Sequence, residues 1–167
     1  MIKNKVYIIP AWGSVCTERP YILLSRALKA KGYNPIPINP NWYHLLTRQV
    51  FRPEPDSIII GHSFGAVLAY LIARKYPLKK VILASLSPVK KLSYNNLYKE
   101  AVKHMSPNMA TAIISDIKSI KIDRKKMICP HILFAGDREK DILSDIKVKN
   151  TGHFLTSTYI KAIVRKL

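Results

Sequence analysis

One serine of this sequence stands where a nucleophile is expected. An apolar run at residues 57–60 leads into Gly-His-Ser-Phe-Gly at 61–65, and a second apolar run follows at 66–73. A Gly-x-Ser-x-Gly pattern between a strand and a helix is typical of a nucleophile elbow, in which the turn strains the serine backbone and the glycines let strand and helix pass closely. The sequence therefore predicts Ser63 as a nucleophile.

A serine hydroxyl needs a base to take its proton and an acid to orient that base, and an elbow predicts the chain order serine, acid, histidine. Of the five histidines, His153 is the best placed, because it follows a short predicted strand and precedes the last predicted helix. His62 adjoins the nucleophile, but strand geometry is expected to direct its side chain elsewhere. The others fall in connecting segments or at the wrong end of a strand: His44, His104 and His131.

Alternating strands and helices must position these residues. Hydrophobic patterning predicts strands at 6–9, 36–38, 57–60, 80–84, 131–135 and 145–149, and helices at 18–31, 41–50, 66–75 and 155–166. This alternation predicts an α/β fold, with a mostly parallel sheet of about six strands and helices on both faces. Sites in such folds lie at the carboxyl ends of the strands.

Residues 88–127 interrupt the alternation. Weakly amphipathic helical segments at 97–105 and 108–117 are separated by Ser106 and Pro107. Their place between two strand ends predicts a small, lid-like helical insertion over the site. A chain of 167 residues is long enough for one core and too short for two ordinary domains, so a single domain over 1–167 is expected.

The chain resembles a compact member of the α/β-hydrolase superfamily, similar in size to the small serine hydrolases of the retinoblastoma-binding-protein type. Residues 61–65 match the elbow, Gly-His-Phe at 152–154 matches the histidine motif, and Pro-Ala-Trp-Gly-Ser at 10–14 resembles the His-Gly-Trp-Gly loop after the first core strand. Ala11 stands where the family usually has glycine. The resemblance implies that the Trp12 and Phe64 N–H groups form the oxyanion hole.

The resemblance also implies a triad acid in the turn after the strand at 131–135, usually three residues past the glycine. That position is Glu139, and glutamate is an allowed triad acid. Asp137 and Asp141 flank it, and Asp141 also fits the family's pattern of an acid followed by apolar residues. The order of preference is Glu139, Asp141, Asp137. The same cluster lacks the glycine and terminal glutamate of a calcium loop, so no metal site is expected.

The net charge of +18 is not gathered in a binding arm. Lysines occur in scattered pairs, and the densest basic run, at 124–126, is short and has no interleaved aromatic residues, so no specific nucleic-acid partner is expected. The first apolar run is broken by Pro10 and has no small-residue cleavage pattern, so we expect neither a signal peptide nor a membrane span. The expected location is the cytoplasm. Cys16 and Cys129 are expected to be free thiols.

Together these features predict a serine hydrolase that cleaves an ester, thioester or amide of a small-molecule acyl substrate through an acyl-enzyme on Ser63. His153 would act as base and Glu139 as acid, without a metal or an organic cofactor. Two alternatives keep the same fold: an acyltransferase that uses the same triad, and a catalytically inactive binding protein. The basic charge alone supports a third, a polyanion-binding module.

Overall fold

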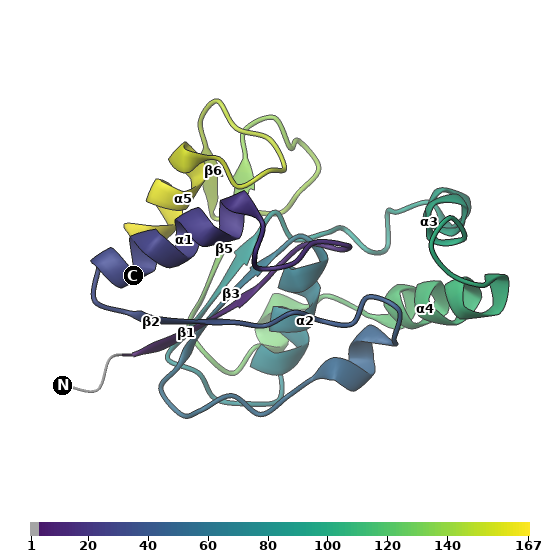
Figure 1. Ribbon diagram of the computed structural model, residues 1–167, viewed down its shortest axis with the longest axis horizontal. Coiled ribbons are helices and arrows are strands. Elements are labelled where there is room, and N and C mark those ends of the chain that lie inside the picture. The colour runs from purple at the N-terminus through teal and green to yellow at the C-terminus, as the bar shows by residue number, and fades with distance from the viewer. Residues whose placement is uncertain (1–3) are drawn as a thin grey trace.

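The computed structural model describes residues 4–167, and within them a single six-stranded sheet forms the centre of the molecule (Figure 1). All neighbouring strands are parallel, in the order β2-β1-β3-β4-β5-β6. The strands are β1 (Lys5–Ile9), β2 (Asn34–Pro37), β3 (Ile58–His62), β4 (Lys80–Ala84), β5 (His131–Gly136) and β6 (Ile146–Val148). The expected α/β fold with about six parallel strands is therefore confirmed.

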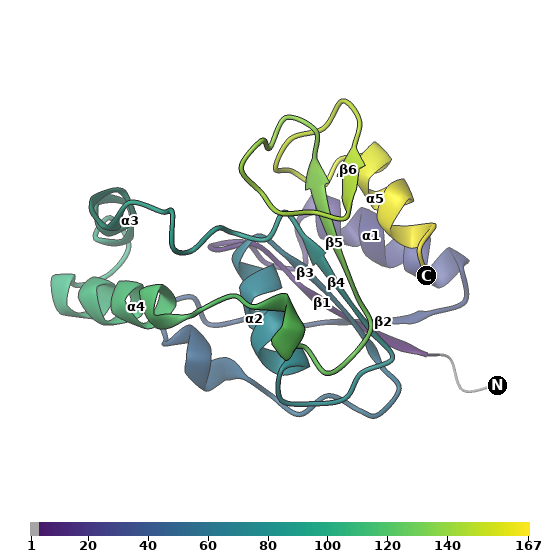
Figure 2. The same ribbon diagram turned by 180° about the vertical axis from the view of Figure 1, so that it is seen from behind.

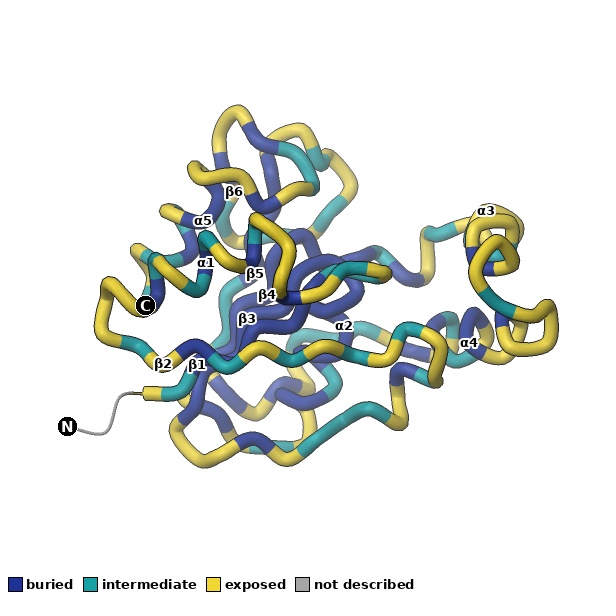
Figure 3. The backbone as a smooth tube through the Cα atoms, viewed as in Figure 1, coloured by how far each residue is buried: buried dark blue, intermediate teal, exposed yellow. Residues whose placement is uncertain are grey.

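Helices cover both faces of this sheet, as Figures 1 and 2 show. One face carries α1 (Arg19–Ala30) and α5 (Ser157–Val164), and the other carries α2 (Phe64–Ala73). Because successive side chains of a strand point to opposite faces, Val6 of β1 joins the core under α1 and α5, and Tyr7 joins the core under α2. The central strands are accordingly buried along their length (Figure 3).

The parallel arrangement brings the carboxyl ends of the strands to one edge. In the register of β3 and β4, His62 pairs with Ala84, and in that of β5 and β6, Gly136 pairs with Val148. The segments that leave these strands therefore start side by side, although they are far apart in the sequence. This edge is where the candidate site residues gather.

The prediction of a helix at 41–50 is wrong. Only one 3-10 turn forms there, η1 (Leu46–Gln49), and the rest is a loop. The Gln49 side chain accepts a hydrogen bond from the Asn41 N–H at 2.7 Å and donates one to the Asn41 carbonyl at 2.8 Å. Such side-chain bonds to backbone groups compete with the helical hydrogen bonds, so Gln49 closes the segment into a loop.

The segment 88–127 contains α3 (Tyr94–Ala101), α4 (Pro107–Ser119) and a 3-10 turn, η2 (Arg124–Lys126). Both α-helices start earlier than predicted because serines cap them: Ser93 accepts from the Asn96 N–H, and Ser106 from the Met109 N–H. In Figure 1 the two helices extend to the right, away from α1 and α5. No helix described within residues 4–167 is long and apolar enough to cross a membrane.

Candidate active site

Ser63 stands at the turn between β3 and α2 with φ at +57°, a value that costs energy for any residue other than glycine. Two glycines make this turn possible. A Cβ atom on Gly61 would lie 2.4 Å from the Gly65 carbonyl oxygen, and one on Gly65 would lie 2.2 Å from that of Pro10. Strand β3, helix α2 and the loop after β1 thus approach too closely for any larger residue.

A hydrogen-bonded line runs from Ser63 through His153 to Glu139. The Ser63 Oγ lies 2.9 Å from His153 Nε2, and His153 Nδ1 lies 2.7 Å from Glu139 Oε1. A carboxylate only accepts hydrogen bonds, so we assign the imidazole proton to Nδ1, which leaves Nε2 to accept the Ser63 hydroxyl proton. This is the geometry that a serine needs in order to lose its proton during attack.

Of the three candidate acids, the structure brings only Glu139 to His153. Asp137 instead accepts hydrogen bonds from the backbone N–H groups of Asn150 at 2.8 Å and Thr151 at 3.1 Å. It therefore holds the loop that precedes His153. Asp141 is exposed, and no side-chain hydrogen bond of it is present in the part of the chain that the structure describes.

The Glu139 carboxylate is fixed at both oxygens. While Oε1 faces His153, Oε2 accepts from the Ser85 hydroxyl and from the Gly136 N–H, each at 2.7 Å. Burial by itself raises the pKa of Glu139, but the hydrogen bonds from His153, Ser85 and Gly136 outweigh burial and hold that pKa below its usual value. The carboxylate is thus charged at neutral pH. The Tyr159 hydroxyl accepts from the Ser85 N–H at 3.1 Å and keeps Ser85 in place.

The Ser63 hydroxyl has a second partner that the sequence analysis did not identify. The Oγ of Ser87, a buried residue three positions past β4, lies 3.1 Å from the Ser63 Oγ. Because Ser63 gives its proton to His153, Ser87 is the donor in this pair. Strand β4 is hydrogen-bonded to β3, the strand that leads into Ser63. A polar residue just after such a neighbouring strand was the sequence signal that could have identified Ser87.

His62 lies closer to the site than strand geometry suggested. It does not reach Ser63, but its ring centroid is 5.3 Å from that of His153, and its Nε2 lies 2.7 Å from the His153 carbonyl oxygen. Burial lowers the pKa of His62 to about 4, so the ring is neutral and Nε2–H is the donor. Its Nδ1 accepts from the Tyr21 hydroxyl at 2.9 Å, and that hydroxyl accepts from the Ala11 N–H at 2.8 Å. This chain of bonds connects the loop after β1 to the backbone of His153.

Trp12 and Phe64 lie together beside Ser63, with ring centroids 5.0 Å apart in an edge-to-face arrangement. Phe64 is the first residue of α2, so its N–H has no carbonyl acceptor within the helix. The Trp12 N–H donates to no protein acceptor within residues 4–167. Backbone N–H groups at a helix start, next to a nucleophile, suit an oxygen that becomes negative.

Two cavities meet at Trp12 and Phe64, which line both of them. The smaller has a volume of about 340 Å³ and is also lined by Ser63 and His153; we call it the Ser63 cavity. It is the space in which a reacting carbonyl would lie.

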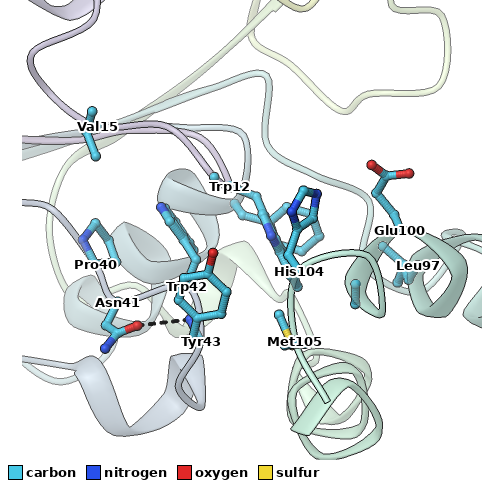
Figure 4. A pocket seen from close by; sticks show the side chains of 13 residues that line it. Trp12, Val15, Pro40, Asn41, Trp42, Tyr43, Leu97, Glu100, His104 and Met105 are labelled. Carbon is cyan, nitrogen blue, oxygen red and sulfur yellow. Dashed lines mark hydrogen bonds between the residues drawn. The ribbon is translucent and has the colours of Figure 1, made fainter. Parts of the chain in front are cut away.

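The larger cavity has a volume of about 650 Å³ and opens between residues 40–43 and the end of α3 (Figure 4). We call it the aromatic cavity, since Trp, Tyr and Phe side chains form part of its lining: Trp12, Trp42, Tyr43 and Phe64. The loop at 41–50, predicted as a helix, thus supplies part of its wall.

No group of three or more His, Cys, Asp and Glu side chains in the described part of the chain could hold a metal ion. Cys16 and Cys129 are buried free thiols. Burial raises the pKa of Cys16 to about 11, so this thiol is not a nucleophile at neutral pH.

In sequence the chain matches no protein-family model and no curated protein. In structure it is similar to Est1E from Butyrivibrio proteoclasticus, with a TM-score of 0.72 at 12% identity over 98% of this chain and 85% of Est1E. It is also similar to the ydeN gene product from B. subtilis, with a TM-score of 0.63 at 15% identity over 98% of both chains. A third similar structure is an extracellular α/β-hydrolase from Paenibacillus species, with a TM-score of 0.61 at 12% identity over 97% of both chains. The fold expected from the resemblance is therefore confirmed.

Proposed function

We propose that this chain, which has the α/β-hydrolase fold, is a serine hydrolase that cleaves a carboxylic ester, thioester or amide through an acyl-enzyme on Ser63. The observation that carries the proposal is the line of hydrogen bonds from Ser63 through His153 to Glu139, with distances of 2.9 and 2.7 Å. In this proposal Ser63 is the nucleophile, His153 the base and Glu139 the acid. A mechanism built on these groups uses no metal and no organic cofactor.

In the acylation half, His153 Nε2 takes the hydroxyl proton while the Ser63 Oγ attacks the carbonyl carbon of the substrate. The negative charge of Glu139 stabilises the imidazolium that forms. The N–H groups of Trp12 and Phe64 donate to the oxyanion, an interaction whose loss typically costs about 3 to 4 kcal/mol of barrier. When the tetrahedral intermediate collapses, the bond to the leaving group breaks and the leaving group takes the proton from His153.

In the deacylation half, water attacks the acyl carbon and gives its proton to His153 Nε2. Collapse of the second intermediate breaks the bond between the acyl carbon and the Ser63 Oγ, and His153 returns a proton to that oxygen. The products are a carboxylic acid and free enzyme.

The proposal also includes the domain organisation: residues 1–167 form one domain, and residues 88–127 act as a lid-like insertion. The support is that the aromatic cavity takes part of its wall from this insertion, namely Leu97, Glu100, Ala101, His104 and Met105. The insertion is anchored outside the cavity as well, because Asp116 of α4 accepts a hydrogen bond from the Thr47 N–H at 3.0 Å.

A fluorophosphonate probe tests the proposal directly, because it phosphonylates an activated serine. We expect covalent labelling of the wild type, none of Ser63→Ala, and full labelling of a control, Ser157→Ala, whose exposed serine starts α5 and lines neither cavity. Wild type and Ser63→Ala should have the same circular dichroism spectrum. An unlabelled wild type, or labelling that survives in Ser63→Ala, would overturn the proposal.

A further inference from the structure

The position of His153 determines on which side of the nucleophile each half of a substrate lies. The leaving oxygen of an ester must take its proton from His153 Nε2, so the alcohol half lies on the His153 side of the reacting carbonyl. His153 lines the Ser63 cavity and is not among the residues that line the aromatic cavity. The acyl half, on the other side of the carbonyl carbon, therefore extends past Trp12 and Phe64 into the aromatic cavity.

The two cavities differ in the size of the group that they accept. The Ser63 cavity, about 340 Å³, must also contain the reacting carbonyl itself. The aromatic cavity, about 650 Å³, lies well within the range of volumes that take drug-sized ligands. The larger half of the substrate is therefore its acyl half.

The walls of the aromatic cavity favour an apolar acyl group. Trp12 and Trp42 are parallel to within 10° with centroids 6.3 Å apart, and Phe64 meets Trp12 edge to face. Leu97 and Met105 add aliphatic and thioether surface from the side of α3 (Figure 4). Such a surface gains most from an aromatic ring or an alkyl chain.

The charges at the aromatic cavity disfavour an acidic acyl group, although the chain as a whole carries a net charge of +18. No Lys or Arg is among the described residues that line it, whereas Glu100 and His104 are. The Glu100 carboxylate is paired with the Lys103 ammonium group at 2.6 Å. Lys103 is not among the residues that line the cavity. An acyl group with its own carboxylate would lie near Glu100 without a Lys or Arg in the described lining to pair with, so the preferred acyl group is uncharged.

The cavity wall is held in place before a substrate arrives. The Trp42 indole N–H donates to the Ser14 carbonyl at 3.1 Å, which fixes the ring against the loop after β1. Gln49 closes the loop that carries Trp42, and Thr47 ties this loop to Asp116 of α4. A preformed cavity loses little entropy on binding and so favours a defined group.

We infer that the aromatic cavity is the acyl-binding chamber of this enzyme, and that its substrates are esters of a bulky, uncharged aromatic or alkyl carboxylic acid with a small alcohol. The inference rests on the proposed function, because it assigns the two halves of a substrate that reacts at Ser63.

Two isomeric esters test this assignment. Methyl 3-phenylpropanoate carries its ring on the acyl half, and 2-phenylethyl acetate carries it on the alcohol half. We expect kcat/KM to be at least about tenfold higher for the first, the effect of burying one ring. An equal or reversed preference, in an enzyme that the fluorophosphonate labels at Ser63, overturns the inference and leaves the proposed function standing. An enzyme that is not labelled and hydrolyses neither ester overturns both.

A filling variant tests which cavity holds the ring. Leu97→Trp should lower kcat/KM for methyl 3-phenylpropanoate about tenfold or more and change that for methyl acetate much less. The matched control is Val102→Trp, at the end of the same helix, because Val102 is 36% exposed and does not line the cavity. Equal effects of Leu97→Trp on both esters would overturn the assignment of the aromatic cavity as the binding site of the acyl group.

The charge argument has its own pair of substrates. Methyl 3-phenylpropanoate with a carboxamide at the para position should be hydrolysed about tenfold faster, in kcat/KM, than the same ester with a para carboxylate. The two groups have nearly the same size, so a difference reports charge. Equal rates would overturn the preference for an uncharged acyl group.

A binding measurement makes the test independent of turnover. The chain has two tryptophans, and Trp42 lines the aromatic cavity and not the Ser63 cavity. In the double variant Trp12→Phe, Ser63→Ala, Trp42 is the only tryptophan and no acyl-enzyme can form. Methyl 3-phenylpropanoate should change its fluorescence saturably, and no change up to the solubility limit of the ester would overturn the inference.

Discussion

The Glu139 Oε1 lies 2.7 Å from the His153 Nδ1, and the other oxygen of the same carboxylate is held by Ser85 and by the Gly136 N–H. Both oxygens of the carboxylate are therefore hydrogen-bonded, one to the imidazole and the other to the protein around it. A carboxylate held in this way fixes the tautomer and the orientation of the imidazole together.

Substitutions should show whether Glu139 or the neighbouring carboxylate Asp141 is the acid that acts on His153. Glu139→Gln keeps the size of the side chain but loses the charge that stabilises the imidazolium, so kcat for p-nitrophenyl acetate should fall about 10³- to 10⁴-fold. Asp141→Asn is the matched control and should keep the wild-type rate, because Asp141 is exposed and the His153 ring is hydrogen-bonded to Glu139 and Ser63 instead. A large loss in Asp141→Asn with little loss in Glu139→Gln would show that the acid is a different one.

Ser87→Ala removes the hydroxyl that donates to the Ser63 Oγ at 3.1 Å. A hydrogen bond of this kind contributes about 1 kcal/mol, so we expect a roughly five- to tenfold drop in kcat and in the rate of fluorophosphonate labelling. The melting temperature should change little, since the alanine leaves only a small space. A labelling rate equal to that of the wild type would mean that Ser87 does not assist the nucleophile.

The elbow glycine Gly65 should tolerate no side chain. In Gly65→Ala the new Cβ would lie 2.2 Å from the Pro10 carbonyl oxygen and 2.4 Å from that of Ile9, and backbone atoms cannot yield cheaply. We expect a loss of more than about 3 kcal/mol in the free energy of unfolding, or no folded protein. Gly152→Ala is the control: its Cβ would meet no atom within 4 Å, and urea unfolding should show a change below about 1 kcal/mol. Similar losses in both variants would refute this reason for the elbow glycines.

His62 should make the stability of the protein depend on pH. Burial lowers its pKa from 6.5 to about 4, so between these values the unfolded chain binds more protons than the folded one. The free energy of unfolding therefore has the full contribution of His62 above pH 6.5 and loses it as the pH falls toward 4, by about 2 to 3 kcal/mol.

The measurement is urea unfolding of the wild type and of His62→Gln at about pH 7 and pH 4.5. The variant has no group that titrates at this position, so it should lose less stability than the wild type over the same interval. An identical loss in both proteins would contradict the assignment of a neutral, buried His62.

The sequence by itself determined the features that depend on neighbouring residues. The elbow at Ser63 is a local pattern of strand, turn and helix, and alternating apolar runs indicated the parallel sheet that the structure confirms. His153 followed from chain order, because the segment between the last strand and the last helix begins at the carboxyl edge of the sheet. The catalytic roles of these residues stay predictions.

Only the tertiary structure decided which carboxylate faces His153. Asp137, Glu139 and Asp141 lie in one turn, where no periodicity fixes the direction of a side chain. Ser85, the residue after the neighbouring strand β4, holds Glu139 in place. Ser87 reaches Ser63 for the same reason, since β4 lies beside β3 in the sheet.

The aromatic cavity, too, exists only in three dimensions. Its walls come from the loop after β1, the loop at 40–43 and the end of α3, segments that no sequence spacing connects. The loop at 41–50 escaped prediction because Gln49 satisfies backbone groups that a helix would otherwise pair. Local patterns thus indicated the turn at Ser63 and the sheet, and packing between distant segments decided which carboxylate faces His153, which hydroxyl faces Ser63 and the shape of the aromatic cavity.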